Sequence, residues 1–383
     1  MAARIQLLLK DTAGAKLALV PDFASLTYTK TVNDQGSFTL VLDGSDPRAA
    51  LFTHDLIVEI WRSDPEISLD WYKDFDGIIL ELDKKIAENS DRELSIRGAG
   101  LLEILSRRVV LYDQQDLGEK WDWGEKVLKE YVKENAGSEA LYSNGRWVDG
   151  NIPTLSVEAY HPTLQGDEWT GEMAGSNLLD ALKQVAELSN VDFTLEQDPL
   201  TPGYYIFKTH YPYGKDLSTA GLSPVTGLNG AGQRPVIFST MFSNLEDVSY
   251  LVSHIGEVNV SVALGQGSSY VQDFEVSENA ASITTEISRR EGTISAQESE
   301  LSVVDDELLY AAYMDLINRK AKKVLRFSPL TSGMFHYGKD YNVGDIITVR
   351  FDAEDISVHF KSITVTLGED SQEKIEFAEM EIV

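Results

Sequence analysis

The chain has 383 residues, 43% of them hydrophobic, so it can fill more than one globular core and is not an intrinsically disordered protein. Acidic residues outnumber basic residues by 62 to 33, which gives a formal net charge of -29 and argues against a protein that grips the phosphate backbone of nucleic acid. The absence of cysteine excludes disulfides, thiolate nucleophiles and zinc-thiolate sites, and leaves the redox compartment open.

No secretion signal or membrane-spanning segment is predicted. The longest apolar run near the N-terminus, Leu7–Leu9, is followed at once by Lys10 and Asp11, which is too short for the hydrophobic region of a signal peptide. No run approaches the roughly 20 apolar residues that cross a bilayer. We therefore expect a soluble protein made in the cytoplasm.

Residues 1–110 are predicted to form a first antiparallel β-barrel domain, because short strand patterns follow one another without a long helix between them. Asn33–Gly36 reads as a tight hairpin loop. A helix is predicted from Ala99 to about Arg108, since Leu101, Leu102 and Leu105 fall on one helical face. The strand segments are RIQLLLK, KLALVP, ASLTYTK, GSFTLVLD, LIVEIWR and RELSIRG, with a longer pair in WYKDFDGIILELDKKIA.

Residues 111–235 are predicted to form a peripheral mixed α+β domain with an aromatic-rich insertion at 111–175. Helices are expected in GEKVLKEYVKE and in SNLLDALKQVAELSN, the second capped by Ser176 or Asn177. The strands VDFTLEQ and YYIFKTHY follow, and then a Gly-, Pro- and Ser-rich connection over residues 219–235. Four of the six tryptophans lie in the insertion: Trp121, Trp123, Trp147 and Trp169.

Residues 236–383 are predicted to form a second β-barrel domain that contains a helix at 305–324 and ends in two strands. Acidic side chains at the start of this helix and basic side chains at its end complement its dipole: Asp305, Asp306 and Glu307, then Arg319, Lys320, Lys322 and Lys323. Its expected buried face is Leu309, Ala312, Leu316 and Ile317. The predicted strands are VIFSTMFS, DVSYLVSHI, EVNVSVALGQ, SYVQDFEVS, ITTEISRRE, SVHFKSITVTL and EKIEFAEMEI.

The stretch HYGKDYNVGDIITVRF, residues 336–351, contains residue types common in active sites, but its pattern is that of a turn and a strand. Asn342–Asp345 has turn chemistry, and from Ile346 the side chains alternate, with Ile347, Val349 and Phe351 on one face. The predicted fold class is therefore α+β and mainly β: two antiparallel, tube-like barrels with an inserted mixed module.

No catalytic, cofactor-binding or metal-ligating residue is assigned. The six histidines have no metal-ligand spacing: His54, His161, His210, His254, His336 and His359. GLNGAGQ at 227–233 lacks the strand-to-helix setting and the Lys-Ser/Thr ending of a phosphate loop, so a flexible loop is expected there. Asp74–Gly77 is similar to part of a calcium loop, but Tyr72 stands at the first ligand position and the match fails.

One enzymatic alternative remains in the aromatic-rich segment, because a glycosidase needs two carboxylates beside an aromatic-lined groove. The candidate residues are Trp121, Asp122, Trp123, Glu125, Asp167, Glu168 and Trp169. Tryptophans more often fill a core or a protein interface. A third class, a glycan-binding module without cleavage, would use Trp121 and Trp123.

Several segments resemble the tail hub proteins of long-tailed, non-contractile phages. In the first domain these are LTYTKTVNDQGSFTLVLDGSDPRAALF, LIVEIWR, FDGIILELDKKI and LSIRGAGLLEILSRRVV; later come NLLDALKQVAEL, VIFSTMFSNLEDVSYLVSHIGEVNVSVALGQG and FHYGKDYNVGDIITVRF. Each is a weak strand-turn pattern, and their order along the chain carries the resemblance, which covers most residues outside about 111–170.

The resemblance implies a structural protein of the virion, without cofactors. Such proteins are similar to the baseplate hub of contractile-tailed phages, whose protomer has two related barrels and forms a trimer. The implied partners are two more copies of the chain, the tail tube and distal tail proteins, the tape measure protein, and spike or receptor-binding proteins. Six similar barrels would form a pseudo-six-fold ring at the tail tip, through which DNA passes without specific binding. A negative lumen would keep phosphates from sticking to its wall.

Overall fold

The computed structural model describes residues 4–67, 69–86, 92–113, 118–267, 272–295, 304–330, 334–352, 354–368 and 373–382. The chain divides into two compact units, Met1–Val248 with Phe327–Val383, and Ser249–Arg326. Strand β14 (Leu245–Ser253) leads the chain out of the first unit, β18 (Lys322–Pro329) leads it back, and the two strands pair with each other.

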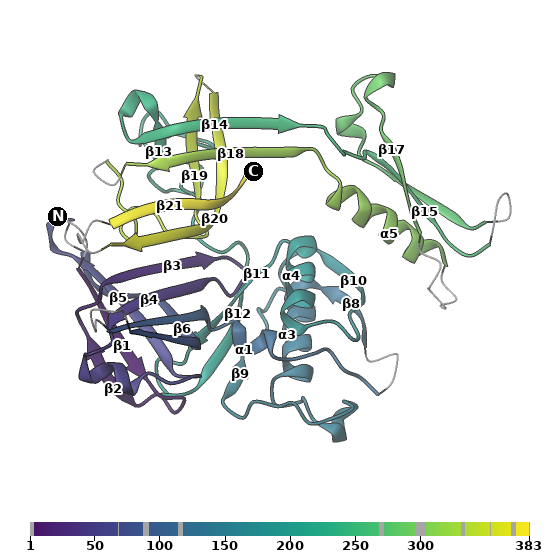
Figure 1. Cartoon of the computed structure of the whole chain (residues 1–383). Coiled ribbons are helices and arrows are strands. Elements are labelled where there is room, and N and C mark those ends of the chain that lie inside the picture. Colours follow the sequence, from purple (N-terminus) through teal and green to yellow (C-terminus); the bar gives the residue numbers. More distant parts are fainter. Residues whose placement is uncertain are drawn as a thin grey trace. The chain divides into compact units, whose positions relative to one another are not determined.

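One sheet dominates the first unit. In the described residues it has eleven strands, in the order β13-β19-β20-β3-β4-β7-β6-β5-β1-β2, with β21 also paired to β20. Figure 1 shows the N-terminal strands as one curved group and the C-terminal strands as another. The bounds are β1 (Arg4–Lys10), β2 (Lys16–Val20), β3 (Ser25–Thr31), β4 (Ser37–Asp43), β5 (Ile57–Asp64), β6 (Leu69–Ile86), β7 (Arg92–Gly100), β13 (Ile237–Ser239), β19 (Ile346–Phe351), β20 (Glu354–Leu367) and β21 (Glu373–Ile382).

The mainly β, α+β class is as predicted, but the two barrels are not confirmed. In the described residues the strand order is an open path, and its end strands, β13 and β2, do not pair with each other. The two groups join because β20 is long enough to pair with two strands along one edge. Its residues 354–359 pair with β19, and its residues 362–367 pair with β3.

Two local predictions in the first domain were wrong. The segment expected to form a pair of strands is the single strand β6, which pairs with β5 on one side and β7 on the other. The helix expected from Ala99 shrinks to α1 (Glu103–Ser106), because Ala99 and Gly100 still pair with β6. The hairpin at Asn33–Gly36 is confirmed, with positive φ angles of 59° and 61° at its two ends.

The helical part of the first unit follows the predicted pattern closely. Helix α3 (Gly124–Asn135) and helix α4 (Leu178–Ser189) share a core in which Leu182, Val185 and Tyr131 are fully buried. Asn177 caps α4, because its side chain accepts hydrogen bonds from the N–H groups of Leu179 and Asp180. Around them lie β8 (Glu119–Trp123) paired with β10 (Glu168–Glu172), and the sheet of β9 (Leu155–Val157), β12 (Tyr205–His210) and β11 (Asp192–Gln197).

An aromatic cluster fills the C-terminal strand group. The ring centroids of Phe360 and Phe377 are 4.1 Å apart, and those of Phe238 and Tyr341 are 5.5 Å apart. Such edge-to-face pairs add to the stability that their buried area gives. Short 3-10 helices occur at η1 (Pro47–Leu51), η2 (Pro65–Ile67), η3 (Tyr142–Asn144) and η4 (Thr240–Phe242).

The second unit is a small sheet covered on one face by a helix. Strand β15 (Val260–Leu264) lies between β16 (Phe274–Glu278), which is antiparallel to it, and β17 (Glu291–Ser295), which is parallel. Helix α5 (Val304–Asn318) packs on β15 through Leu308 and Ala312. The 3-10 turns η6 (Ala280–Ser282) and η7 (Glu286–Ser288) connect β16 to β17. The strand predicted in ITTEISRRE is therefore wrong, since a capped turn replaces it and the strand begins later.

Helix α5 also differs from its prediction. It ends at Asn318, and Lys322 and Lys323 belong to β18. Leu309, expected on the buried face, is 44% exposed, and Leu308 is buried in its place. The face is set by packing on β15, which the spacing of apolar residues alone did not reveal. Among the described helices, none combines the length and the apolar composition needed to cross a membrane.

Candidate functional site

The stretch at 336–351 is used structurally, as its pattern predicts. His336 and Asp340 bond to each other within the turn, and Asp345 accepts hydrogen bonds from the N–H groups of Lys215 and Asn342, both at 2.7 Å. Strand β19 then enters the sheet with Ile347 and Val349 buried. Tyr337, which also belongs to this stretch, points into a buried polar cluster.

This cluster, here called the Asp74 network, consists of Asp74, Tyr28, Lys30, Arg62 and Tyr337. Asp74 accepts hydrogen bonds from Tyr28 Oη at 2.5 Å, Lys30 Nζ at 2.7 Å and Tyr337 Oη at 2.9 Å. Arg62 donates to Tyr28 Oη at 3.1 Å, and its Nε lies 3.8 Å from an Asp74 oxygen. The side chain of Asp74 has no exposed area, so no substrate reaches it.

The electrostatics of the network fit a structural role. Burial alone would raise the pKa of Asp74, but the charges of Lys30 and Arg62 and the hydrogen bonds hold it below its ordinary value. Burial, and after it the charge of Asp74, raises the pKa of Tyr28 and Tyr337 well above the usual value. The carboxylate is thus ionised and both phenols are protonated over the physiological range. The network joins β3, β5 and β6 to the turn before β19.

Glu125, a candidate acid in the aromatic-rich segment, is buried and its carboxylate is hydrogen-bonded to neighbouring groups of the protein. Its carboxylate accepts hydrogen bonds from Lys129 Nζ at 2.7 Å and from the N–H groups of His161 at 2.7 Å and Gln165 at 3.0 Å. Burial raises its pKa, but these donors lower it overall. A glycosidase acid needs a raised pKa and access to the sugar, and Glu125 has neither.

The other candidate carboxylates do not face one groove. In the β8–β10 pair, Asp122 lies opposite Trp169, whereas Glu168 lies opposite Trp123, one position along. Opposed residues share a face and neighbours alternate, so Asp122 and Glu168 project from opposite faces of this ribbon. Asp122 is paired with Lys126, and Asp167 accepts a hydrogen bond from Asn190. The structure therefore does not bring the predicted acids together.

The four tryptophans divide into one core residue and three surface residues. Trp169 is buried against Tyr131, with ring centroids 6.0 Å apart. Trp121 and Trp123 are 80% and 41% exposed on the outer face of β8, and Trp147 is 65% exposed after η3. An exposed tryptophan pair on one strand can contact a sugar ring or a protein partner.

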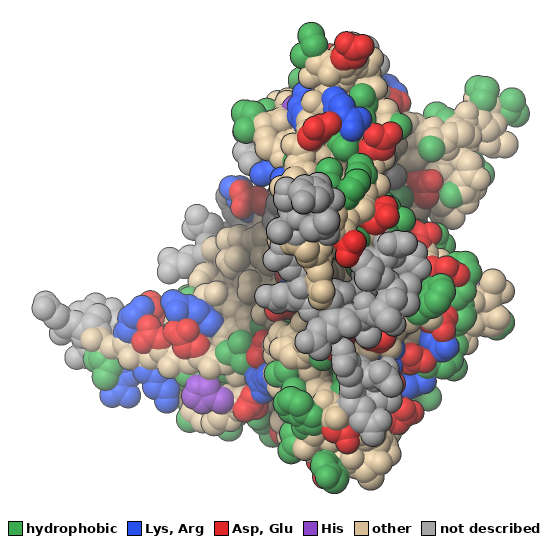
Figure 2. All heavy atoms as spheres, turned by 90° about the vertical axis from the view of Figure 1, so that its right-hand side faces the viewer, with side chains coloured by type: hydrophobic (Ala, Val, Ile, Leu, Met, Phe, Trp, Pro, Cys, Tyr) green, Lys and Arg blue, Asp and Glu red, His purple; other side chains and the backbone are tan. Residues whose placement is uncertain are grey.

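The remaining candidates have ordinary roles. Within the described ranges, no group of three or more His, Asp or Glu side chains could hold a metal ion. Asn229 organises the loop at 227–233, since its side chain donates to the carbonyls of Asp216 and Ser218 and accepts from the N–H of Gln233. On the face shown in Figure 2, acidic side chains are intermingled with basic and hydrophobic ones and form no single negative field.

The fold is similar to that of phage tail proteins. The 43 kDa tail protein of prophage MuSo2 from Shewanella oneidensis aligns with a TM-score of 0.54 and 11% identity over 99% of this chain and 98% of its own. A tail protein from Neisseria meningitidis MC58 aligns with a TM-score of 0.54 and 14% identity over 98% and 96%. A chain of a Francisella PdpA-VgrG complex gives 0.53 and 10% identity over 98% of this chain and 53% of that one.

These identities are low enough that the structural comparisons establish the fold alone. No curated protein matches the sequence. The family comparison is more specific, because residues 5–378 match as one continuous stretch and so include both units and the aromatic-rich segment. The chain therefore belongs to the family of Siphovirus ReqiPepy6 Gp37-like proteins.

Proposed function

We propose that this protein is a non-enzymatic hub of a siphophage tail tip. Three copies form a ring that joins the tail tube and distal tail protein to spike or receptor-binding components. The observation that carries the proposal is the similarity of fold to two tail proteins, one of them from a prophage, over 98–99% of the chain, together with the family match. The virion tail tip is accordingly its proposed location.

In this proposal the N-terminal and C-terminal strand groups are the two tube-forming parts of each protomer, with residues 111–235 as the peripheral domain between residues 1–110 and 236–383. Three protomers then supply six similar parts, which can meet a six-fold tube. DNA and the tape measure protein pass through the opening during ejection. The net charge of -29 is consistent with a wall that does not retain DNA.

The edge of the sheet at β2 offers a contact between protomers. This strand ends the sheet order, pairing with β1. It exposes Leu17 (44%) and Leu19 (50%) on one face, and the adjacent η1 exposes Leu51 (44%). An apolar edge of this kind is an aggregation hazard in a free monomer and an asset in an assembly. The similarity to a chain of a PdpA-VgrG complex supports a spike protein as a further partner.

Electron microscopy and light scattering of the purified protein test the proposal. We expect particles of three copies with a central opening. Changing Leu17 and Leu19 together to Asp should release monomers, whereas changing Val225, which is 92% exposed in a loop, to Asp should leave the assembly unchanged. A monomer at all concentrations, or a solid disc, would contradict the ring.

A second candidate, glycan binding, is favoured by the exposure of Trp121 and Trp123 on one face of β8. Binding to purified host cell wall that is lost when both are changed to Ala, with the assembly intact, would support it. Turnover of peptidoglycan that is lost in Glu168→Gln, or in Glu125→Gln under conditions where that variant is shown to be folded, would instead support a tail-associated glycosidase in residues 111–175.

A further inference from the structure

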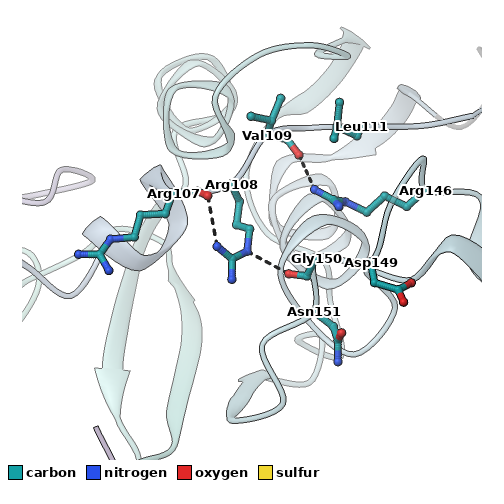
Figure 3. A pocket seen from close by; sticks show the side chains of 8 residues that line it. All are labelled: Arg107, Arg108, Val109, Leu111, Arg146, Asp149, Gly150 and Asn151. Carbon is teal, nitrogen blue, oxygen red and sulfur yellow. Dashed lines mark hydrogen bonds between the residues drawn. The ribbon is translucent and has the colours of Figure 1, made fainter. Parts of the chain in front are cut away.

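A hollow of about 340 Å³ opens between the segment that follows α1 and the segment that follows η3. Its polar side chains come from Arg108, Arg146, Asp149 and Asn151, with Arg107 at its rim. Figure 3 shows Arg108 and Arg146 reaching from the two segments towards the space between them, while Arg107 points away. The volume is at the lower end of small-molecule sites, which span about 300–1,000 Å³.

Arg146 is a buried cation that forms no ion pair with the described residues. Its residue is 4% exposed. One terminal nitrogen donates to the carbonyl of Val109 at 3.0 Å and the other donates to the carbonyl of Val148. Its Nε is buried and has no hydrogen-bond partner in the described part of the chain. Burial, and after it the charge of Arg108, lowers the pKa of Arg146, and the charges of Tyr112 and Asp149 oppose this only in part.

Arg108 repeats this arrangement from the other segment. Its Nε donates to the carbonyl of Gly150 at 2.9 Å and a terminal nitrogen donates to the carbonyl of Arg107 at 3.2 Å. Within the described ranges, neither Arg108 nor Arg146 forms an ion pair. Arg107 differs, since it is bound to Asp55 at 2.7 Å and to Glu103 at 3.0 Å.

Two neighbouring guanidinium groups that form no ion pair with the described residues are unusual in a protein of 62 acidic and 33 basic residues, and the Asp149 carboxylate of the same pocket offsets their charge only in part. Burial of a charge that forms no ion pair is unfavourable for Arg146, and the nearby charge of Arg108 adds to this, whereas Arg108 itself is only partly buried. Gly150 permits the arrangement, because a Cβ there would lie 2.5 Å from a terminal nitrogen of Arg146. The pocket therefore places two guanidinium groups where a ligand oxyanion can bind.

The rest of the lining restricts which oxyanion fits. Asp149 accepts a hydrogen bond from the N–H of Tyr142 through one oxygen, at 2.7 Å, which leaves its second oxygen for a ligand donor. The amide of Asn151 makes no side-chain hydrogen bond with the described residues. The Asp149 carboxylate disfavours a doubly charged phosphate, and the guanidinium pair disfavours a ligand ammonium group. A ligand that carries one carboxylate and several hydroxyl groups has neither a double negative charge nor an ammonium group, and so fits this lining.

We propose that this pocket binds a carboxylate-bearing sugar of the uronic-acid type. The sugar carboxylate accepts hydrogen bonds from the partly exposed Arg108 guanidinium and lies beside the guanidinium of Arg146, since arginine is well suited to bind oxyanions. Ring hydroxyls donate to Asp149 and bond with Asn151. The inference rests on the pocket alone and holds whether or not the protein forms a ring.

Titration of the full chain with D-glucuronate, followed by saturation-transfer NMR and calorimetry, tests the proposal. We expect binding of glucuronate, none of glucose at the same concentrations, and a shift of the Arg146 Nε–H resonance. Loss of one charge-assisted hydrogen bond typically weakens binding about tenfold to hundredfold, and Arg108→Gln should do so. Arg107→Gln is the matched control and should bind as the wild type does.

Gly150→Ala provides a second variant if Arg146→Gln fails to fold. It keeps every charge but displaces the Arg146 guanidinium, and it should weaken glucuronate binding while thermal unfolding shows a folded protein. Inorganic phosphate should bind more weakly than glucuronate. Asp149→Asn should reduce this difference in affinity, because it removes the carboxylate that repels phosphate. No glucuronate binding, equal binding of glucose or phosphate, or equal losses in Arg107→Gln and Arg108→Gln would overturn the proposal.

Discussion

The Asp74 network gives the most direct test of how the first unit is held together. Changing Asp74 to Ala removes the acceptor of three hydrogen bonds and leaves Lys30 and Arg62, whose side chains are 24% and 3% exposed, without their buried anion. Breaking a buried ion pair by removing one partner costs about 3–5 kcal/mol. For a unit of this size, about 2 °C in Tm accompanies each kcal/mol, so we expect a loss of roughly 6–10 °C.

Scanning calorimetry at pH 7 measures this loss, and Asp76→Asn is the matched control. Asp76 lies two residues further along β6 and pairs with Lys73, but its side chain and that of Lys73 are 17% and 30% exposed. Solvent-screened pairs contribute about 0–1 kcal/mol, so the control should shift Tm by no more than about 2 °C. Equal shifts in the two variants would refute the assignment of Asp74 as the centre of a buried network.

The direction of the Asp74 pKa shift predicts how the stability difference between the wild type and Asp74→Ala depends on pH. Because the pKa of Asp74 is lowered in the folded protein, its contribution is present above the unfolded pKa of about 3.9 and is lost as the pH falls through the folded value. The difference in stability between wild type and Asp74→Ala should therefore be constant near neutral pH and shrink below about pH 4. A gap that grows on acidification would show that another group is responsible.

Four further variants test, by calorimetry, how buried, exposed and turn residues contribute to stability. Glu125→Gln should lower the unfolding free energy by about 1–3 kcal/mol, because the buried Lys129 keeps only the half-exposed Glu158, 3.6 Å away, as an anion. A variant as stable as the wild type would reopen a catalytic role for Glu125. Trp169→Ala should lower the unfolding free energy by about 3–5 kcal/mol because Trp169 is buried, whereas Trp121→Ala should lower it by less than about 0.5 kcal/mol because Trp121 is exposed. Similar losses in the two variants would contradict this difference in burial. Gly338→Ala should lower the unfolding free energy by about 1–3 kcal/mol, because φ at Gly338 is +83° and a Cβ there would lie 2.1 Å from Tyr72 Oη. An unchanged Tm would mean that the turn adjusts to the added methyl group without strain.

Local patterns predicted most elements, because each depends on neighbours in the sequence. The capped helix α4, the hairpin at Asn33–Gly36 and the strand after Asn342–Asp345 all have their determining residues within a few positions. The failures have a different origin. The buried face of α5 is set by β15, and the boundary of β7 is set by its pairing with β6, both of which are tertiary contacts.

The candidate sites also depend on tertiary contacts that the local sequence does not reveal. The sequence placed Asp122, Glu125 and Glu168 in one segment, but the alternation of β8 and β10 and the donors around Glu125 keep them from acting together. The guanidinium pair of Arg108 and Arg146 was missed, because these residues are 38 positions apart and only the fold brings them to one pocket. A weak signal exists, since Arg108 lies in the basic, acid-free run Arg107–Arg108–Val109–Val110–Leu111 of an otherwise acidic chain.

The junction of β3 and β20 shows why the two strand groups form one sheet. Closing a loop of about 330 residues costs only about 3 kcal/mol more than closing a short hairpin, since the entropy grows with the logarithm of length. Six cross-strand pairs offset that cost, and among them Thr29 bonds Thr364 at 2.8 Å and Thr31 bonds Ser362 at 2.9 Å. Without β20, β3 would be an exposed edge of β-prone residues, so the last strands of the chain protect the first group from unspecific pairing. Among the described residues no strand pairs with the outer edge of β2, which is why the proposed contact between protomers falls there.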